Sequence, residues 1–150
     1  ILINKSSGEF IARQDADDTS KPDRIRKQID MFQSLDLDVV GSRALVKQTG
    51  KTIPSLSYYL PLKISMLYKN PFIHGTLVFR KRILEKVNYY NEDFYYAQDY
   101  KIMSDVLKLT NKIKILNEPL YVLNTKNNLS TNHSEKQKYF ADCVRKNLKP

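Results

Sequence analysis

Three carboxylates stand within four positions of the segment FIARQDADDTSKPDRIRKQ (residues 10–28), at Asp15, Asp17 and Asp18. Like charges this close repel one another, so the cluster is unfavourable unless a cation lies beside it. Hard divalent cations prefer carboxylate oxygens and accept water and phosphate oxygens as their remaining ligands. Because residues i and i+2 of an extended segment point the same way, we expect Asp15 and Asp17 to face one cation at the end of a strand.

A calcium-binding loop between two helices is excluded as an explanation of this acidic segment. Such a loop needs Gly at its sixth position and Glu at its twelfth, where this chain, counted from Asp15, has Ser20 and Arg26. A solvated turn in which Asp18 caps the following helix remains a second explanation. That explanation accounts for Asp18 but for neither Asp15 nor Asp17.

Strands and helices are expected to alternate along the chain, with the acidic segment at the end of a short strand. Ser20 and Pro22 predict the start of a helix whose apolar face contains Ile25, Ile29 and Phe32. In chain order we expect a strand in 9–16, a helix in 19–35, a buried strand from Asp38 to Val46 with a bend or bulge at Gly41, a polar loop from Lys47 to Ser57, a short helix after Pro61, a strand from Ile73 to Phe79, two helices in 81–109 separated by an aromatic loop, paired strands in 112–125 and a closing helix in 134–148. This order, without internal repeats, predicts one α/β domain.

Length and composition are those of a globular domain. With 150 residues, of which 41% are hydrophobic, the chain can form one domain with a sizeable core. It contains no apolar run near the roughly 20 residues that cross a bilayer, and no signal peptide at its start, so we expect a cytoplasmic location. The single cysteine, Cys143, excludes an internal disulfide and a thiolate metal site.

The chain is basic, with a formal net charge of +9, and the excess is unevenly distributed. From Lys101 onward there are ten Lys or Arg against four Asp or Glu. Such a surface can attract nucleic acid, an anionic membrane or a phosphorylated substrate, and charge alone does not choose among them. An AT-rich genome would also account for the abundant Lys, Asn, Ile and Tyr.

Three segments resemble the family 2 glycosyltransferases of the GT-A fold, and they occur in the order found in that family. GEFIARQDADDTSKPDRIRKQIDMF (residues 8–32) closely resembles the metal-binding segment, in which Asp-Ala-Asp-Asp follows a small strand and precedes a helix led by Pro. NPFIHGTLVFRKRILEKVNYYNEDFYYAQDYKIMSDVL (residues 70–107) is similar to the acceptor-side segment. EPLYVLNTKNNLS (residues 118–130) is similar to the strands and loop that close the catalytic core.

The resemblance implies an inverting glycosyltransferase that moves a sugar from a nucleotide-diphosphate donor to a saccharide or lipid-linked acceptor. Asp15 and Asp17 would hold Mn²⁺ or Mg²⁺ against the donor diphosphate, with Arg13 and Ala16 as further donor-binding residues. Asp99 would be the general base that takes the proton from the attacking acceptor hydroxyl. The residues implied for acceptor binding are His74, Gly75, Thr76, Gln98 and Asp99.

The chain departs from the family pattern at several of these positions. Gln98 stands where Glu is usual before the base, and Gly75 replaces the customary Pro after His74. Asn88 and Tyr89 occupy the place of a usual Gly-Gly pair.

The closing loop departs from the pattern as well. It has Val122 and Asn124 where Arg and His are frequent, so His133 is a candidate substitute for a metal or diphosphate ligand. Lys126 is a candidate phosphate contact in the same region, and a solvated surface lysine is the alternative.

The resemblance further implies that residues 1–150 are a single, partial GT-A domain of the α/β class. Its parts would be the metal-binding segment at 10–28, the acceptor and base segment at 70–107, and the closing strands and C-terminal helix at 112–148. The nucleotide-binding half of the family fold, a β-α-β-α-β unit, would precede Ile1, so we expect the isolated chain to be inactive. A sheet edge left uncovered in this way would favour self-association.

The setting implied by the resemblance is bacterial surface polysaccharide or lipopolysaccharide synthesis at the inner face of the plasma membrane, with peripheral contact to anionic lipid. Two other classes remain open, a non-catalytic basic binding module and a degenerate transferase-like interaction protein, the latter suggested by Gln98. In NYYNEDFYY (residues 88–96) the aromatic residues alternate with Glu92 and Asp93 rather than with basic residues, so we expect no nucleic-acid partner.

Overall fold

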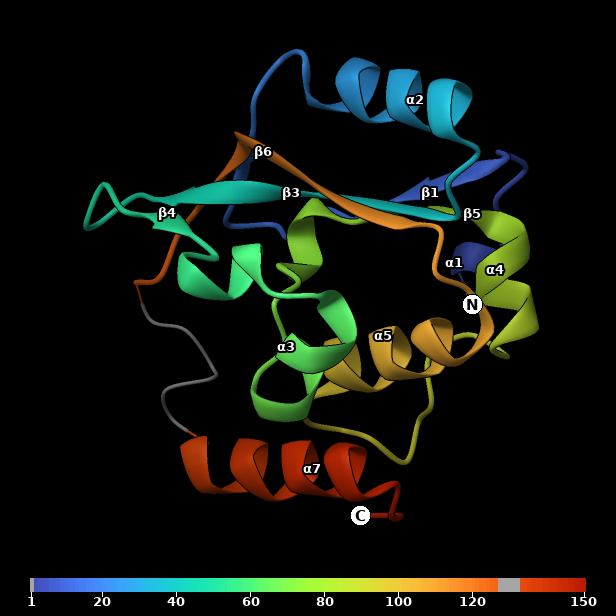
Figure 1. Cartoon of the computed structure of the whole chain (residues 1–150), viewed down its shortest axis with the longest axis vertical. Coiled ribbons are helices and arrows are strands. Elements are labelled where there is room, and N and C mark those ends of the chain that lie inside the picture. Colours follow the sequence, from blue (N-terminus) through green and yellow to red (C-terminus); the bar gives the residue numbers. More distant parts are fainter. Residues whose placement is uncertain (1, 127–132) are drawn as a thin grey trace.

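The computed structural model describes residues 2–126 and 133–150, which form a mixed β-sheet with helices on both faces (Figure 1). The sheet has six strands in the order β1-β5-β3-β6-β2, and β4 pairs with β3 outside this path. The strands are β1 (Phe10–Ala12), β2 (Thr19–Ser20), β3 (Val39–Val46), β4 (Thr52–Ile53), β5 (Val78–Arg80) and β6 (Ile113–Leu123). The helices are α1 (Leu2–Lys5), α2 (Arg24–Leu35), α3 (Leu62–Tyr68), α4 (Lys81–Lys86), α5 (Gln98–Leu109) and α7 (Ser134–Lys146), with the 3₁₀ helices η1 (Leu56–Tyr59) and η2 (His74–Thr76). Within these described ranges, no helix is both long enough and apolar enough to span a membrane.

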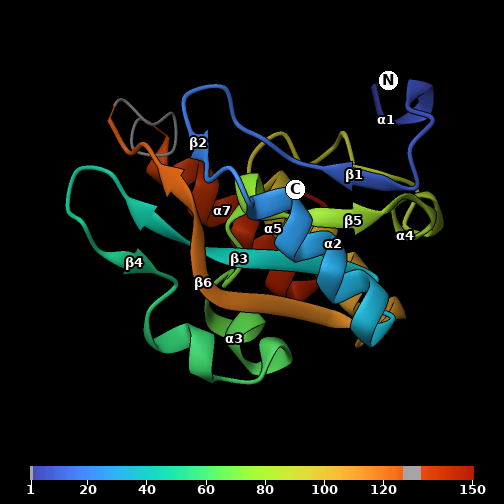
Figure 2. The ribbon, with the colours of Figure 1, turned by 90° about the horizontal axis from the view of Figure 1, so that it is seen from above.

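Strand β3 is the centre of the fold and confirms the buried strand expected from Asp38 to Val46. It pairs antiparallel with β5 and parallel with β6, and its first four residues are buried. A strand covered on both faces is expected to be apolar along its length. Helix α2 covers one face of the sheet, α3 and α5 lie on the other, and α7 packs beyond α5 (Figure 1). Figure 2 shows α2 crossing over the sheet in the view from above.

The larger hydrophobic core lies between the sheet and α5. Helix α5 confirms the second of the two helices predicted in 81–109, and its Tyr100, Met103, Val106 and Leu107 are buried. A smaller core beneath α2 contains Phe32, Leu37, Val40 and Val78. These two cores fix the sheet between its helical layers, and the described residues contain no buried side-chain nitrogen or oxygen without a hydrogen-bond partner.

The pair of strands predicted in 112–125 is wrong, because this segment forms the single strand β6. The turn-like residues around Pro119 lie inside the strand, where the pairing with β3 shifts register between Ser42 and Ala44. Proline has no backbone N–H to donate to a ladder, and an irregularity of register lets the strand continue past it. The last residues of β6 then pair with β2, beside the acidic segment.

Two expectations for neighbouring segments also need correction. The strand expected from Ile73 to Phe79 is a 3₁₀ turn, η2, followed by the short strand β5. The bend predicted at Gly41 lies between Ser42 and Ala44 instead. Gly41 serves close packing, because a Cβ atom there would lie 3.1 Å from Cδ2 of Leu77.

Helix α2 begins later than predicted and buries a different face. Ser20 lies in β2, and the helix starts at Arg24. Its buried residues are Arg24, Gln28 and Phe32, spaced by four, whereas Ile25 is 45% exposed. The N-terminal cap position belongs to Asp23, so the capping role considered for Asp18 is wrong.

The loop between α4 and α5 contains several left-handed residues. Asn88 and Tyr89 have φ angles of 57° and 63°, and Ala97, directly before α5, has a φ of 57°. Glycine adopts this conformation at little cost, whereas other residues do so rarely. A Gly-Gly pair, as is usual in the resembling family, suits these left-handed φ angles. This chain makes the turn with Asn88 and Tyr89 in place of the two glycines.

Candidate functional site

The acidic segment forms a tight turn after β1. The backbone N–H of Asp18 donates to the carbonyl of Asp15 at 3.3 Å, so the extended geometry predicted for Asp15 and Asp17 is wrong. Asp17 and Ala16 are exposed at the tip, while Asp15 is partly buried. The Asp18 carboxylate instead accepts a hydrogen bond of 2.7 Å from the backbone of Asn124, beyond the end of β6. Partial burial raises the pKa of Asp18, although this hydrogen bond opposes the shift.

Asp15 is held from two sides. Its carboxylate forms an ion pair of 2.5 Å with the guanidinium of Arg13. Its backbone N–H donates to the hydroxyl oxygen of Tyr121, on β6, at 3.1 Å. Burial is the main reason that the pKa of Tyr121 lies above its ordinary value, and the neighbouring Asp18 and Asp15 carboxylates act in the same direction. Tyr121 therefore stays neutral and can serve as a fixed acceptor.

Gly75 brings the acceptor-side segment into contact with the acidic turn. A Cβ atom at this position would lie 2.3 Å from the Tyr121 hydroxyl oxygen and 3.0 Å from Oδ2 of Asp15. No side chain larger than hydrogen fits this space without displacing one of these residues. The glycine found in place of the family's proline is thus explained by a close approach between two segments 60 positions apart.

A buried pair on α2, Arg24 and Gln28, holds the acidic turn against the sheet. The Arg24 guanidinium donates to the carbonyl of Arg13 at 2.6 Å and to the side-chain oxygen of Gln14 at 3.1 Å. Its Nε donates to Oε1 of Gln28 at 3.0 Å. Gln28 then donates to the carbonyls of Val40 at 2.9 Å and Thr76 at 2.8 Å. One hydrogen-bonded chain therefore connects the acidic turn, strand β3 and the acceptor-side turn η2.

His74 lies among the charged groups of the candidate site. Its Nε2 is 2.7 Å from the hydroxyl of Tyr90. Burial lowers the pKa of His74, while the Asp99 and Asp15 carboxylates oppose that shift and Arg13 adds to it. Burial also raises the pKa of Tyr90 to about 12. The carboxylates of Asp15 and Asp99 therefore act electrostatically on the same histidine.

Asp99 lies in the first turn of α5, where a carboxylate interacts favourably with the helix dipole. Nδ2 of Asn70 donates to Oδ2 of Asp99 at 2.9 Å, and Oδ1 of Asn70 accepts from the backbone of Phe72 at 3.0 Å. The second bond fixes the orientation of the Asn70 amide. Gln98, the neighbouring acceptor candidate, is exposed at the helix start.

Thr76, a predicted acceptor-binding residue, is held inside the fold. It is fully buried, its hydroxyl donates to the carbonyl of Ile73 at 2.8 Å, and it accepts from the backbone of Ser42 at 3.2 Å. A hydroxyl occupied on both sides has no surface to offer a saccharide. Its role is to fix η2 against β3.

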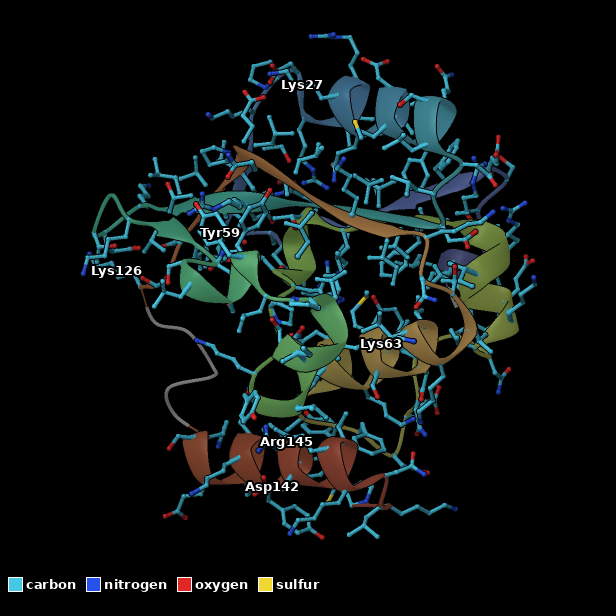
Figure 3. The ribbon with its side chains drawn as sticks, viewed as in Figure 1. Lys27, Tyr59, Lys63, Lys126, Asp142 and Arg145 are labelled. Carbon is cyan, nitrogen blue, oxygen red and sulfur yellow. The ribbon has the colours of Figure 1, made fainter. Side chains whose placement is uncertain are left out.

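The two candidates from the closing loop, Lys126 and His133, are both exposed. Lys126 is exposed at the end of the segment that follows β6 (Figure 3). The ring of His133, at the start of α7, lies 5.5 Å from that of Tyr96. Residues 127–132, which continue the closing loop, lie outside the described residues.

A divalent cation would find two carboxylates at this turn, Asp15 and Asp17. In the described part of the chain, no group of three or more His, Cys, Asp or Glu residues is arranged to hold a metal ion. The donor set fits a hard cation whose other ligands come from water or from a second molecule, such as a diphosphate. A cation with two protein carboxylates as ligands would therefore bind together with that second molecule.

Sequence reasoning missed several residues that build the site: Asn70, Tyr90, Arg24, Gln28 and Tyr121. The sequence contained a signal for two of them. Arg24 and Gln28 precede Phe32 at intervals of four residues, which places all three on one face of the helix. Polar residues at core-facing positions are unexpected unless they are paired, and pairing across the fold is invisible in the sequence.

Comparison with known proteins gives the chain a family context. The family model described as Glycosyl transferase family 2 matches residues 1–88. The O-antigen biosynthesis glycosyltransferase WbnJ of Escherichia coli is 34% identical over 108 residues, which are 70% of this chain and 42% of that protein. An uncharacterized glycosyltransferase of Haemophilus influenzae is 30% identical over 117 residues, 69% of this chain and 36% of its own length. The chain thus spans less than half the length of these relatives.

Solved structures of TarS from S. aureus show the same fold. The complex with UDP-GlcNAc matches with a TM-score of 0.72 at 16% identity, over 95% of this chain and 43% of that one. A further structure of TarS 1–349 matches with a TM-score of 0.67 at 17% identity, over 92% and 41% of the two chains. At these identities the likeness concerns the fold, which is the GT-A fold predicted from the sequence.

Proposed function

The chain belongs to the family 2 glycosyltransferases, and from that premise we propose that it carries the metal-binding and acceptor-side elements of an enzyme that transfers a sugar from a nucleotide-diphosphate donor. The observation that supports this most directly is the approach of Gly75 to Asp15. This contact joins the segment proposed to bind the donor to the segment proposed to bind the acceptor. The two substrates of a transferase must meet at such a junction.

Asp15 and Asp17 are the proposed ligands of Mn²⁺ or Mg²⁺, together with oxygens of the donor diphosphate. The bound cation would neutralise charge on the departing nucleoside diphosphate. Arg13, which pairs with Asp15 at 2.5 Å, supplies a guanidinium beside the same turn and suits a phosphate oxygen. The backbone of Ala16, at the exposed tip, completes the donor-binding residues that we propose.

Asp99 is the proposed general base. It accepts the proton of the acceptor hydroxyl while that oxygen forms a bond to the anomeric carbon and the bond from carbon to the diphosphate oxygen breaks. Displacement from the face opposite the leaving group inverts the anomeric configuration. Asn70 acts as a positioning residue, because its hydrogen bond of 2.9 Å holds one carboxylate oxygen of Asp99. His74, Gly75 and Gln98 are the proposed acceptor-side residues around the base.

The relatives support a carbohydrate polymer as the product. WbnJ is named for O-antigen biosynthesis, and TarS was solved with UDP-GlcNAc. We therefore propose a UDP-sugar or a similar nucleotide sugar as donor and a saccharide or lipid-linked saccharide as acceptor, in surface-polysaccharide or lipopolysaccharide synthesis. The proposed location is the cytoplasm, at the inner face of the bacterial membrane. We also propose that the 150-residue chain alone lacks activity, because it corresponds to 43% of the TarS chain.

The test is calorimetric titration of the full-length protein with Mn²⁺ and UDP, followed by an assay of sugar transfer. Asp17→Ala is expected to abolish the mutual strengthening of Mn²⁺ and UDP binding. Asp99→Asn is expected to keep that binding and to lower turnover by about 10²–10⁴-fold. Asp30→Ala, at an exposed position on α2, is the matched control and should change neither quantity.

Opposite results would contradict separate parts of the proposal. Metal-dependent UDP binding that survives in Asp17→Ala would remove the role given to the acidic turn. Full turnover in Asp99→Asn would require another base. Sugar transfer by the isolated 150-residue chain would contradict its proposed inactivity.

A further inference from the structure

An unusual number of large apolar side chains is exposed on η1 and α3. Six of them have exposed fractions between 45% and 82%: Leu56, Tyr59, Leu60, Ile64, Leu67 and Tyr68. Together with Lys63 and Lys69 they form what we call the 56–69 surface. Single exposed apolar residues need no explanation, but six of them within 13 consecutive positions are typical of an interaction site.

This surface belongs to an ordered element whose other side is anchored in the core. Ser65 and Met66 are buried, and the Ser65 hydroxyl donates to the carbonyl of Ser57 at 3.0 Å, which ties α3 to η1. The hydroxyl of Tyr100, on α5, donates to the carbonyl of Met66. Tyr58 packs inward with the guanidinium of Arg43 5.3 Å from its ring centre. The exposed side chains are therefore presented by a fixed, amphipathic scaffold.

The charged side chains of the segment that carries the 56–69 surface have one sign. Between residues 39 and 84 the sequence contains eight Lys or Arg and no Asp or Glu. Within the surface itself, Lys63 and Lys69 are exposed. Apolar side chains flanked only by basic ones are complementary to a surface that is apolar inside and negatively charged outside.

A groove extends the 56–69 surface toward α7. It has a volume of about 330 Å³, and its walls include Lys63, Leu67, Leu107, Lys108 and Arg145. Figure 3 shows Lys63 on α3 and Arg145 on α7, and residues of both helices and of α5 line this groove. Of its basic side chains, Lys108 is ion-paired with Asp105 and Arg145 with Asp142.

We propose that the 56–69 surface binds an anionic phospholipid membrane. Leucine and isoleucine would enter the boundary between headgroups and acyl chains, where tyrosine rings also favour the interface. The lysines would extend their alkyl stems along the apolar layer and place their ammonium groups among lipid phosphates. A protein partner would more commonly meet aromatic and arginine anchors with few lysines, because lysine is depleted in protein interfaces.

The 56–69 surface lies next to the residues proposed to bind the acceptor, so membrane binding bears on the proposed reaction. Asn70 directly follows this surface and bonds to the proposed base Asp99 at 2.9 Å. A membrane bound at 56–69 would therefore lie next to the acceptor side, where a lipid-linked acceptor would arrive. Membrane binding itself needs neither sugar nor metal, so it can be tested even if the proposed transfer reaction is wrong.

The test is co-sedimentation of the full-length protein with vesicles of phosphatidylcholine alone or mixed with phosphatidylglycerol. The wild type is expected to bind only the anionic vesicles and to dissociate as salt is raised. Replacing Leu56, Tyr59 and Leu67 by serine should reduce the partition coefficient more than about tenfold. Lys63→Glu and Lys69→Glu should each reduce it about fivefold.

Matched controls separate this surface from general hydrophobicity and charge. Serine at Leu109, Tyr139 and Leu148, which are 55–57% exposed, removes the same residue types elsewhere and should leave binding intact. Lys114→Glu, at an exposed position on β6, makes the same charge change as Lys63→Glu and should have a smaller effect. UDP affinity of each variant should match that of the wild type, which also verifies folding.

Three results would overturn the proposal. The first is wild-type protein that ignores anionic vesicles, since the surface would then be covered by another part of the protein. The second is an equal loss of binding in the control variants. The third is a change from dimer to monomer in the serine variant without vesicles, which would assign the surface to a second copy of the chain.

Discussion

Asp15 is the residue whose surroundings are most closely defined. Arg13 pairs with its carboxylate, Tyr121 accepts from its backbone, and Gly75 leaves no room between them. A metal ligand needs a fixed orientation of this kind, because a carboxylate that must reorganise loses part of the binding free energy. Substitutions at single residues around Asp15 are therefore the strictest tests of the site.

Gly75→Ala is expected to destabilise the protein by about 1–3 kcal/mol, because the new methyl group overlaps the Tyr121 hydroxyl. It should also weaken joint Mn²⁺ and UDP binding, since Asp15 lies on the other side of the same space. Urea unfolding and calorimetric titration measure the two effects. Adding Tyr121→Phe to the alanine variant should restore part of the stability by removing one overlapping atom, and a glycine site that tolerates alanine without any change would contradict the packing argument.

His74 is expected to make the stability of the metal-free protein depend on pH. Its pKa in the folded state lies below the ordinary value of 6.5, so the unfolded state binds its proton more readily. The stability is therefore fully present above about pH 6.5 and falls as the pH is lowered through the window beneath that value. His74→Gln should flatten the fall, measured by urea unfolding across this window. The same substitution at His133, an exposed residue, is the control and should not flatten it.

At the scale of elements, helix α2 does more than cover the sheet. Gln28 bonds both to Val40 in β3 and to Thr76 in η2, while Arg24 bonds to the carbonyl of Arg13. Burial lowers the pKa of Arg24, but an arginine remains charged, so the charge must be satisfied by these oxygen atoms. The helix thus sets the distance between the acidic turn and the acceptor side.

Gln28→Leu is expected to lower the free energy of unfolding by about 2–4 kcal/mol. The substitution nearly preserves volume but leaves two buried carbonyls and the Nε of Arg24 without their partner. Gln33→Leu makes the same chemical change at an exposed position of the same helix and should change stability little. Equal unfolding midpoints for the two variants in urea would show that the buried hydrogen-bonded chain contributes nothing.

At the scale of the whole molecule, the sheet ends in short strands, β1 on one side and β2 on the other. Both edges carry backbone groups able to pair with another chain. The matched regions cover 42% of WbnJ and 43% of the TarS chain.

We expect the isolated 150-residue chain to self-associate as its concentration rises. The physical reason is the backbone groups at the two sheet edges, which can pair with another copy. Sedimentation velocity over a concentration series measures the effect. The serine variant at Leu56, Tyr59 and Leu67 is the control, because association through sheet edges should persist in it. A monomer at all concentrations would refute the expectation.

Local patterns in the sequence determined much of the element order. The helix α5, the strand β3 and the closing helix α7 were all predicted, because periodicity of 2 or 3.6 residues is a property of neighbouring positions. The acidic segment and the acceptor-side segment could be identified for the same reason, since each is a short run of residue types. Family membership followed from such runs and was confirmed by the family model.

Only the tertiary structure decided how these segments meet. The pairing of Arg24 with Gln28, the contact of Gly75 with Asp15 and the continuation of β6 past Pro119 each depend on a partner far along the chain. A glycine looks the same in a sequence whether it serves a turn or a close approach, and a proline between strand residues predicts a turn unless a neighbouring strand accommodates it. Residue types and spacing therefore determined which chemistry the chain can carry, while packing between distant segments decided which side chains share one site.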